Sequence, residues 1–136
     1  HESNALPWTR SCFVCGAENP HGLQLRSHTD GSRVWVDFTP RPCDVGYCEI
    51  VHGGILTTLL DEVMTWAAIL AAHRMCVAAE ICVRLRSPAR VGQQLLDAVH
   101  HADAGPEDGH QGTFRSESIF VFVLAMGVSI STSTSG

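Results

Sequence analysis

Two short features of the sequence could do chemistry together. His52-Gly53-Gly54 precedes a stretch with helical spacing, so the glycine N–H groups would lie at a helix start. There, backbone donors lack partners and the helix dipole is positive. Fixed donors of this kind stabilise the negative charge that develops on a carbonyl oxygen during acyl transfer. Asp61 follows in the same stretch, where its carboxylate could act as a general base or as a nucleophile.

Each feature also has a plain structural interpretation. The tripeptide His52-Gly53-Gly54 could be only a tight turn, and a lone Asp61 on a helix is usually solvated. Gly54 and Asp61 are also about 10 Å apart along one helix, so a single helix cannot easily bring both groups to one carbon atom. Two helices lying antiparallel across a dimer would bring the glycine turn of one subunit to the aspartate of the other.

Hydropathy patterning indicates the elements that must position these residues. Apolar residues with helical spacing predict a helix from Ile55 to about Ala72, with one buried face made by residues 55, 56, 59, 60, 63, 64 and 67. The other side carries Thr57, Thr58, Asp61, Glu62 and Thr65. This helix would be the only long one in the chain.

The remaining apolar stretches favour strands. Leu23–Leu25 and Val34–Phe38 alternate with polar residues around a turn at residues 29–32, which predicts a hairpin. No element is predicted over residues 40–49. Further strands are expected over residues 76–86, 91–100 and 113–130, with a loop at 101–112. The order of elements predicts an α+β fold, with an antiparallel sheet and one helix packed on it.

Composition limits the kind of protein. The 136 residues are expected to form a single domain, with a loop segment at 1–22 and a frayed tail at 131–136. A net charge of -5 argues against nucleic acid as a partner. Charged residues make up only 17%, which favours self-association. The longest apolar run, Ile119–Ile130, is too short to span a bilayer, and no secretion signal is visible, so we expect a cytoplasmic protein with reduced cysteines and no membrane partner.

Several motifs occur together in this sequence. An acid, Asp61, stands nine residues after the histidine of His52-Gly53-Gly54. Further motifs lie on both sides: Cys12-Phe13-Val14-Cys15-Gly16, Asn19-Pro20, Gly22-Leu23, Ala79-Glu80 through Arg86-Ser87-Pro88, and Val91-Gly92. In this combination the chain resembles the hotdog-fold acyl-CoA thioesterases of the phenylacetate-degradation type over most of residues 12–95.

The resemblance implies a fold, a reaction and a set of roles. The fold would be a curved antiparallel sheet wrapped around the helix, forming a homodimer through the sheet edge, with a homotetramer left open. The substrates would be coenzyme A thioesters. Gly53 and Gly54 N–H, next to His52, would stabilise the oxyanion, and Asp61 would be general base or nucleophile. The alternative is a non-catalytic hotdog protein that binds acyl thioesters or aromatic ligands.

Two departures from the family pattern bear on these roles. Related enzymes often carry Ser or Thr on the strand after the helix to hold the attacking water, and the matching position here is Ala78. Glu62 or Thr65 would have to substitute for it near the substrate. The family also turns within the stretch that matches residues 120–124 at a Gly or Asp, and none is present here, so we expect a shortened or irregular C-terminal hairpin.

Two further groups of residues could bind ligands. Arg84, Arg86 and Arg90 could contact the phosphates of the coenzyme, although arginines at a strand end are more often simply solvated. Cys12 and Cys15 have the spacing of half a zinc site, which Cys43, Cys48, His21 or His28 would have to complete. Since no second cysteine pair with that spacing exists, loop thiols are favoured, and neither a metal nor a cofactor is expected.

Overall fold

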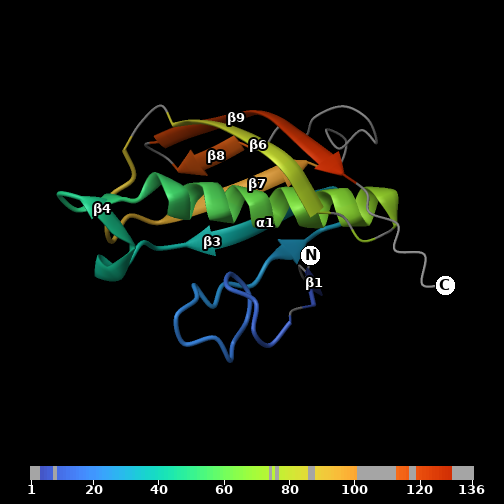
Figure 1. Ribbon diagram of the computed structural model, residues 1–136, viewed down its shortest axis with the longest axis horizontal. Coiled ribbons are helices and arrows are strands. Elements are labelled where there is room, and N and C mark those ends of the chain that lie inside the picture. The colour runs from blue at the N-terminus through green and yellow to red at the C-terminus, as the bar shows by residue number, and fades with distance from the viewer. Residues whose placement is uncertain are drawn as a thin grey trace.

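The computed structural model describes residues 4–7, 9–73, 75, 77–85, 88–100, 113–116 and 119–129. In this part of the chain, one long helix lies against the concave face of a seven-stranded antiparallel sheet (Figure 1). The predicted loop at 101–112, the predicted tail at 131–136 and Arg86 lie outside the described residues. The α+β arrangement expected from the sequence is confirmed.

The helix is α1, Gly53–Ala72, and it is accompanied by a 3₁₀ turn, η1, at Pro42–Asp44. The strands of the main sheet are β1 (Asn4–Ala5), β2 (His28–Thr29), β3 (Arg33–Phe38), β6 (Val77–Leu85), β7 (Leu95–His100), β8 (Thr113–Ser116) and β9 (Ile119–Ser129). Their order across the sheet is β1-β2-β3-β7-β8-β9-β6. A small second sheet consists of β4 (Val45–Tyr47) and β5 (Ile50–Val51).

Helix α1 forms because its apolar residues recur on one face. Leu56, Leu59, Leu60, Val63, Met64 and Ala67 are all buried, as the spacing predicts. The helix starts at Gly53, two residues before the predicted start, and ends where His73 adopts a left-handed conformation with φ of 54°. By length and composition alone, Gly53–Ala71 could cross a membrane, a test that the core helix of a globular domain also passes. Here its apolar face packs on its own sheet.

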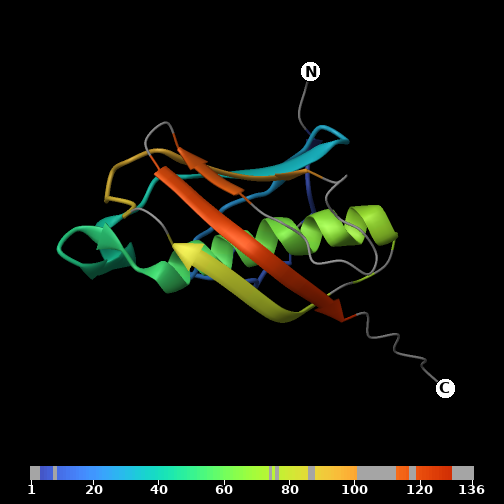
Figure 2. The same ribbon diagram turned by 90° about the horizontal axis from the view of Figure 1, so that it is seen from above.

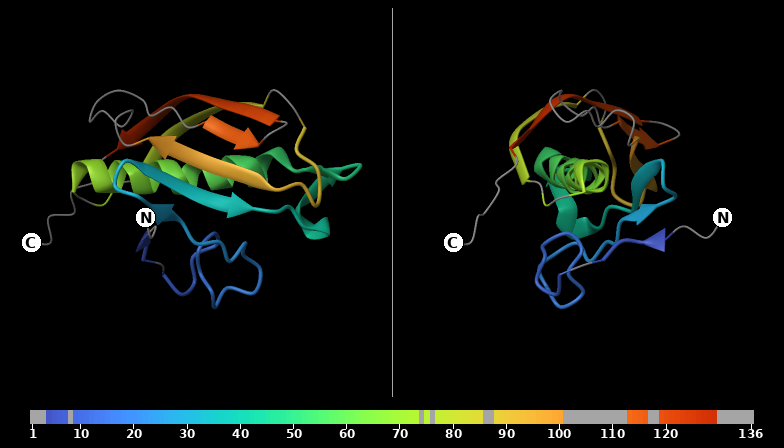
Figure 3. Two further views of the ribbon diagram at one scale, coloured as in Figure 1. Left: turned by 180° about the vertical axis from the view of Figure 1, so that it is seen from behind. Right: turned by 90° about the vertical axis from the view of Figure 1, so that its right-hand side faces the viewer.

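The sheet covers only part of the helix. Seen along the helix axis, the sheet curves over the top and both sides of α1, and the chain before β2 lies below it, on the open side (Figure 3). We call residues 9–27 the N-terminal segment. Its buried Val14 and Leu23 join the same hydrophobic core as Leu59 of α1 and Val34 of β3. The helix is therefore enclosed by two different parts of the chain.

The N-terminal segment explains why the first predicted strand is wrong. Leu23 and Leu25 donate backbone hydrogen bonds to the carbonyl groups of Phe13 and Val14, at 2.8 and 2.7 Å, and so lie in a loop. Only His28–Thr29 pairs with β3, and the strand is two residues long. Leu23 and Leu25 do alternate with polar residues, but the backbone that they bond to belongs to a loop and not to a strand.

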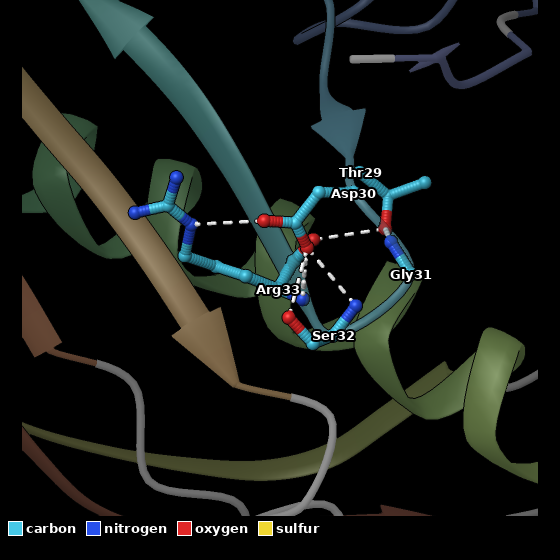
Figure 4. Close-up of polar contacts among 5 residues, drawn as sticks. All are labelled: Thr29, Asp30, Gly31, Ser32 and Arg33. Atoms are coloured by element: carbon cyan, nitrogen blue, oxygen red, sulfur yellow. Dashed lines mark hydrogen bonds and ion pairs between the residues drawn. The ribbon is translucent and has the colours of Figure 1, made fainter. Parts of the chain in front are cut away.

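The turn between β2 and β3 lies where the sequence predicts it (Figure 4). Asp30 Oδ1 accepts hydrogen bonds from Ser32 N, Ser32 Oγ and Arg33 N at 2.8–3.0 Å, and Thr29 Oγ1 accepts one from Gly31 N at 3.2 Å. These bonds hold the pKa of Asp30 below its usual value, although the group is exposed. Gly31, with φ of 94°, supplies the left-handed residue that this turn requires.

Strands β7, β8 and β9 differ in their bounds from the strands that the sequence predicts. β7 begins at Leu95 and not at Val91, because Gly92, with φ of 80°, forms a turn in which Gln93 N donates to Arg90 O. The predicted strand over residues 113–130 is two strands, and β8 ends at Ser116 where β9 begins opposite it at Ile119. Residues 120–124, where the family pattern places a turn, lie inside β9, so the chain does not turn there. The hairpin is short on one side, because β8 has only four residues.

Strands β9 and β6 run side by side and cross the helix obliquely (Figure 2). Their pairing extends from Val77 opposite Ser129 to Leu85 opposite Val121, with two register shifts along the way. β6 has no partner on its other side within the described residues, so it forms one edge of the main sheet.

The sequence predicted no element over residues 40–49, and the structure places η1 and the small sheet there. Asp44 organises this region: it is buried, and its carboxylate accepts hydrogen bonds from Arg41 N, Nε and Nη2 at 2.8–3.1 Å. The carbonyl group of Asp44 also accepts from His52 N at 2.9 Å. This region is thereby joined to the residue that precedes α1.

Candidate active site

The two glycine amides at the start of α1 have different surroundings. His52 caps the helix, because its Nδ1 accepts a hydrogen bond from Gly54 N at 2.9 Å. An accepting Nδ1 leaves the ring proton on Nε2. No hydrogen bond to Gly53 N is found among the described residues. Of the two predicted oxyanion donors, only Gly53 therefore has an amide that is free to donate to a ligand.

Side chains approach the backbone closely at both glycines. A Cβ atom on Gly54 would lie 2.9 Å from His52 Nδ1, too close for the imidazole to keep its capping position. A Cβ atom on Gly53 would lie 2.6 Å from Leu85 Cδ1, at the end of β6. The end of the edge strand thus reaches the helix start, and the glycines let side chains approach the backbone there.

Asp61 lies two turns further along the helix and is half-buried. Burial raises the pKa of its carboxyl group, and a weaker opposing effect comes from Thr65, whose Oγ1 donates to Asp61 Oδ1 at 3.3 Å. A carboxylate with a raised pKa is a stronger base than one in water. Thr65 fixes its orientation. The sequence predicts that Thr65 contacts substrate or the attacking water; in the structure its hydroxyl group bonds to the carboxylate itself, and contact with substrate stays a prediction.

Glu62 lies beside Asp61 on the helix but has different neighbours. Burial raises the pKa of its carboxyl group, while hydrogen bonds from Trp66 and Cys15 oppose this effect. Trp66 Nε1 donates to Glu62 Oε1 at 3.2 Å. The sequence predicts Glu62 on the same side of the helix as Asp61. In the structure Glu62 faces the N-terminal segment and contacts Cys15, which the sequence did not predict.

A group of possible metal ligands surrounds Glu62. The sulfur atoms of Cys12 and Cys15 and a carboxylate oxygen of Glu62 lie within 4.8 Å of one another. Burial, followed by the hydrogen bond with Cys12, raises the pKa of Cys15 to about 12. The residues expected to complete such a site, among them Cys43 and Cys48, do not join it among the described residues. No local pattern in the sequence marks Glu62 as a possible metal ligand, because its contact with the two cysteines depends on the fold.

The arginines proposed to bind phosphate lie at different places. Arg90 is exposed and pairs with Ile50 through an isolated bridge. Because Ile50 is three residues before Gly53, Arg90 lies near the helix start. Arg84 pairs with Phe122 between β6 and β9. Phosphate binding by these residues stays a prediction.

Ala78 is in β6, opposite Val128, and packs against the hydrophobic core. It brings no hydroxyl group to the site. The hydroxyl group that bonds to Asp61 is that of Thr65, on the helix itself.

Comparison with known proteins gives the fold a family context. The model of the thioesterase superfamily matches residues 49–97, which include Gly53, Asp61 and β6. No curated protein sequence matches the chain.

Three solved structures illustrate the likeness. A thioesterase superfamily protein is 23% identical, with a TM-score of 0.72, over 89% of this chain and 61% of its own length, so the chain spans less than two thirds of that protein. The Escherichia coli PaaI protein from the phenylacetic acid degradation operon is 19% identical, with a TM-score of 0.61, over 76% and 75%. An acyl-CoA hydrolase from Staphylococcus aureus, in complex with butyryl coenzyme A and coenzyme A, is 16% identical, with a TM-score of 0.58, over 74% and 65%. The chain thus has the hotdog fold of the thioesterase superfamily structures.

Proposed function

We propose that this protein is an acyl-CoA thioesterase that works as a homodimer. The observation that carries the proposal is the pairing of two features on one helix: a free Gly53 N–H at the start of α1 and a half-buried Asp61 carboxylate two turns later. Both lie in the stretch that matches the thioesterase superfamily model. A donor for an oxyanion and a strengthened base are the two groups that thioester hydrolysis requires.

In the proposed reaction, the carbonyl oxygen of the thioester accepts a hydrogen bond from Gly53 N–H. Asp61 of the partner subunit removes a proton from a water molecule as its oxygen attacks the carbonyl carbon. Alternatively, the carboxylate attacks this carbon itself, and water then hydrolyses the resulting acyl-aspartyl anhydride, which releases the acid and restores Asp61. In either case the bond to sulfur breaks, and coenzyme A leaves as a thiol after taking up a proton. Thr65 is a positioning residue, since it holds the orientation of the carboxylate in its own subunit.

The dimer is proposed because one helix cannot supply both groups. Gly54 and Asp61 are about 10 Å apart along α1. The free edge of β6 offers a way to bring a second helix close, since its backbone donors and acceptors can pair with those of a second β6. Val77 and Leu85 on this strand are 56% and 48% exposed, which is unusual for large apolar side chains and fits an interface. A homotetramer would require a second interface.

The substrate class is proposed as coenzyme A thioesters, and aryl-acyl groups of the phenylacetate type are the first to test. Support comes from the two fold relatives, one named for the phenylacetic acid degradation operon and one solved with coenzyme A compounds. Arg90 lies close to the helix start, where it could bind a phosphate of the coenzyme while the thioester reaches Gly53. Arg84 and Arg86 are further candidates, and Glu62 and Thr65 line the same side of α1 as Asp61.

A direct test is hydrolysis of a panel that contains acetyl-, butyryl-, phenylacetyl- and palmitoyl-CoA, followed through the free thiol that is released. We expect turnover with at least one of these thioesters and a dimeric mass in analytical ultracentrifugation at micromolar concentration. A monomer with full activity would refute the shared site. A dimer that releases no thiol from any member of the panel would refute the enzyme.

One observation favours a second candidate function. Ala78 contributes no hydroxyl group, and the Thr65 hydroxyl is bonded to Asp61, so the protein could bind acyl thioesters without turning them over. Calorimetric titration with a thioether analogue of coenzyme A thioesters separates the two candidates. Binding together with no turnover on the panel would favour the binding protein.

A further inference from the structure

The N-terminal segment meets α1 through a tightly wound turn at Cys12–Gly16. Gly16 N donates to Cys12 O at 2.9 Å, and a Cβ atom on Gly16 would lie only 2.5 Å from that same oxygen. The turn can therefore be this tight only because residue 16 is glycine. In this turn the side chains of Cys12 and Cys15 both point toward Glu62 of α1.

This turn is fixed on both sides. Phe13 O and Val14 O accept hydrogen bonds from Leu23 N and Leu25 N, and Val14 is buried in the core. Cys12 also packs against the core. The position of the two thiols relative to α1 is thus set by the fold and does not depend on a ligand.

Three donor atoms converge at this place. The two sulfur atoms and a carboxylate oxygen of Glu62 lie within 4.8 Å of one another, which is the spacing of ligands around one metal ion. Cys15 N donates to Cys12 Sγ at 3.3 Å, which holds the two residues of the turn together. Trp66 Nε1 donates a hydrogen bond to the Glu62 carboxylate, and bonds of this kind orient the ligands of metal ions in proteins.

The donor set selects the kind of ion. Two thiolates and one carboxylate favour a divalent ion of the zinc class over magnesium or calcium, which prefer oxygen ligands alone. Three protein ligands complete a tetrahedral shell when a water molecule takes the fourth position, and Cys12 and Glu62 are only partly buried, so water has access.

We propose that Cys12, Cys15 and Glu62 bind one zinc ion, which joins the N-terminal segment to helix α1. This reverses the expectation from the sequence, which counted cysteine pairs and could not foresee the carboxylate. The ion would fix the N-terminal segment over the side of the helix that the sheet leaves open. The proposal stands on ligand geometry and does not depend on the proposed hydrolysis.

The first experiment measures metal binding by the wild-type protein. Protein that has been reduced and stripped of metal is titrated with zinc in competition with a chromophoric chelator, and is then titrated with cobalt. We expect one ion per chain, with thiolate-to-cobalt charge-transfer absorption in the near ultraviolet and tetrahedral bands in the visible. We also expect the melting temperature to rise when zinc is bound.

Variants then test the three ligands one at a time. Cys12→Ser, Cys15→Ser and Glu62→Gln should each weaken zinc binding on the order of 100-fold or more, and each cysteine variant should reduce the charge-transfer absorption. Glu62→Gln keeps an oxygen that can accept from Trp66, so the helix should fold normally. Cys43→Ser and Cys48→Ser are matched controls, since both thiols are exposed and lie outside the cluster, and they should bind zinc as the wild type does.

Three results would overturn the proposal. The first is reduced wild-type protein that binds no zinc at micromolar concentration. The second is zinc binding that survives Cys12→Ser or Cys15→Ser but is lost in Cys43→Ser or Cys48→Ser. The third is unchanged affinity in Glu62→Gln, because then the carboxylate is not a ligand. Since the wild-type titration needs no variant, a variant that fails to fold leaves the proposal testable.

Discussion

The side of α1 that faces the sheet is apolar and fully buried, whereas the other side carries ionisable groups that are half-buried, of which Glu62 contacts the N-terminal segment. Leu59, Leu60, Val63 and Met64 on the first side have no exposed surface. Asp61 and Glu62 on the second side keep contact with water, and burial raises the pKa of each. One helix thus serves as the core of the domain and as a carrier of reactive groups.

The difference follows from what covers each side. A sheet brings continuous rows of apolar side chains, and its backbone groups are already paired, so it can bury the helix completely. A loop segment brings turns, free backbone groups and thiols, and can enclose polar side chains without leaving them unpaired. Stability should therefore depend on the first side and chemistry on the second, and each of the following changes tests that division.

The largest effect is expected on the polar side. Asp61→Asn keeps the size of the side chain but cannot accept a proton or attack as a carboxylate, so kcat for thioester hydrolysis should fall by about 10² to 10⁴. The free energy of unfolding should hardly change. Steady-state kinetics and urea unfolding on the same protein measure both quantities.

The control for this change is Asp37→Asn, because Asp37 lies exposed on β3 and makes no hydrogen bond or ion pair with α1 within the described part of the chain. It should leave kcat and stability near those of the wild type. If Asp61→Asn retains more than about a tenth of the wild-type kcat, the carboxylate is not the base or nucleophile.

On the apolar side, the effect should appear in stability. Leu60 is fully buried, and Leu60→Ala should lower the free energy of unfolding by about 2 to 5 kcal/mol, because the lost contacts leave a cavity. Urea unfolding measures the loss. Leu70→Ala makes the same chemical change on the same helix at a partly buried position and should cost less. Equal losses in the two variants would contradict the contrast between the sides.

The helix start should show an intermediate effect on stability. His52→Ala removes the acceptor for Gly54 N and should destabilise the protein by about 0.5 to 2 kcal/mol, as the loss of a helix cap does. Thermal unfolding followed by circular dichroism measures it. His21→Ala, at an exposed loop position, is the matched control and should leave the melting temperature unchanged.

A smaller effect is expected when the carboxylate loses its orienting partner. Thr65→Val keeps the shape of the side chain but removes the hydrogen bond to Asp61, so kcat should fall about 5-fold, which corresponds to one ordinary hydrogen bond. Thr58→Val also removes a hydrogen bond on α1, to Gly54 O, without touching Asp61. If both variants lower kcat equally, Thr65 acts on the helix and not on the carboxylate.

The smallest effect concerns acid stability near the helix start. Burial alone would raise the pKa of Asp44, but its bonds with Arg41 outweigh burial and hold the pKa below the usual value. This carboxylate therefore contributes stability above its ordinary pKa of about 4, and that contribution is lost as the pH falls through the lower pKa of the folded state.

The stability difference between the wild type and Asp44→Asn should therefore shrink on acidification. Urea unfolding at a series of pH values measures it. The exposed Asp37→Asn should show no such trend, and a difference that stays constant down to low pH would contradict the role of the ion pair.

The sequence predicts one side of α1 better than the other. The spacing of residues such as Leu56, Leu60 and Val63 is a local signal, and it identified the buried face and nearly the correct helix bounds. The spacing of His52 and Asp61 is local as well. The contact between Glu62 and Cys15, in contrast, joins residues that are far apart in the sequence, and no periodicity marks it.

The strands show the same limit. Alternation around Leu23 and Leu25 is real, but their backbone groups bond to Phe13 and Val14, a choice that only the packed chain determines. The capping role of His52 was also not predicted, because an imidazole seldom serves as a helix cap. Local patterns thus gave the elements, while their partners required the fold.

The position of β6 at the sheet edge has a consequence for the way the chain is made. β6 follows α1 directly, yet its only partner among the described residues is β9, which is near the other end of the sequence. During synthesis, α1 can already pack against β3 and the N-terminal segment, which precede it, whereas β6 emerges before the strand that pairs with it. We therefore expect β6 to join the sheet only after β9 has been synthesised.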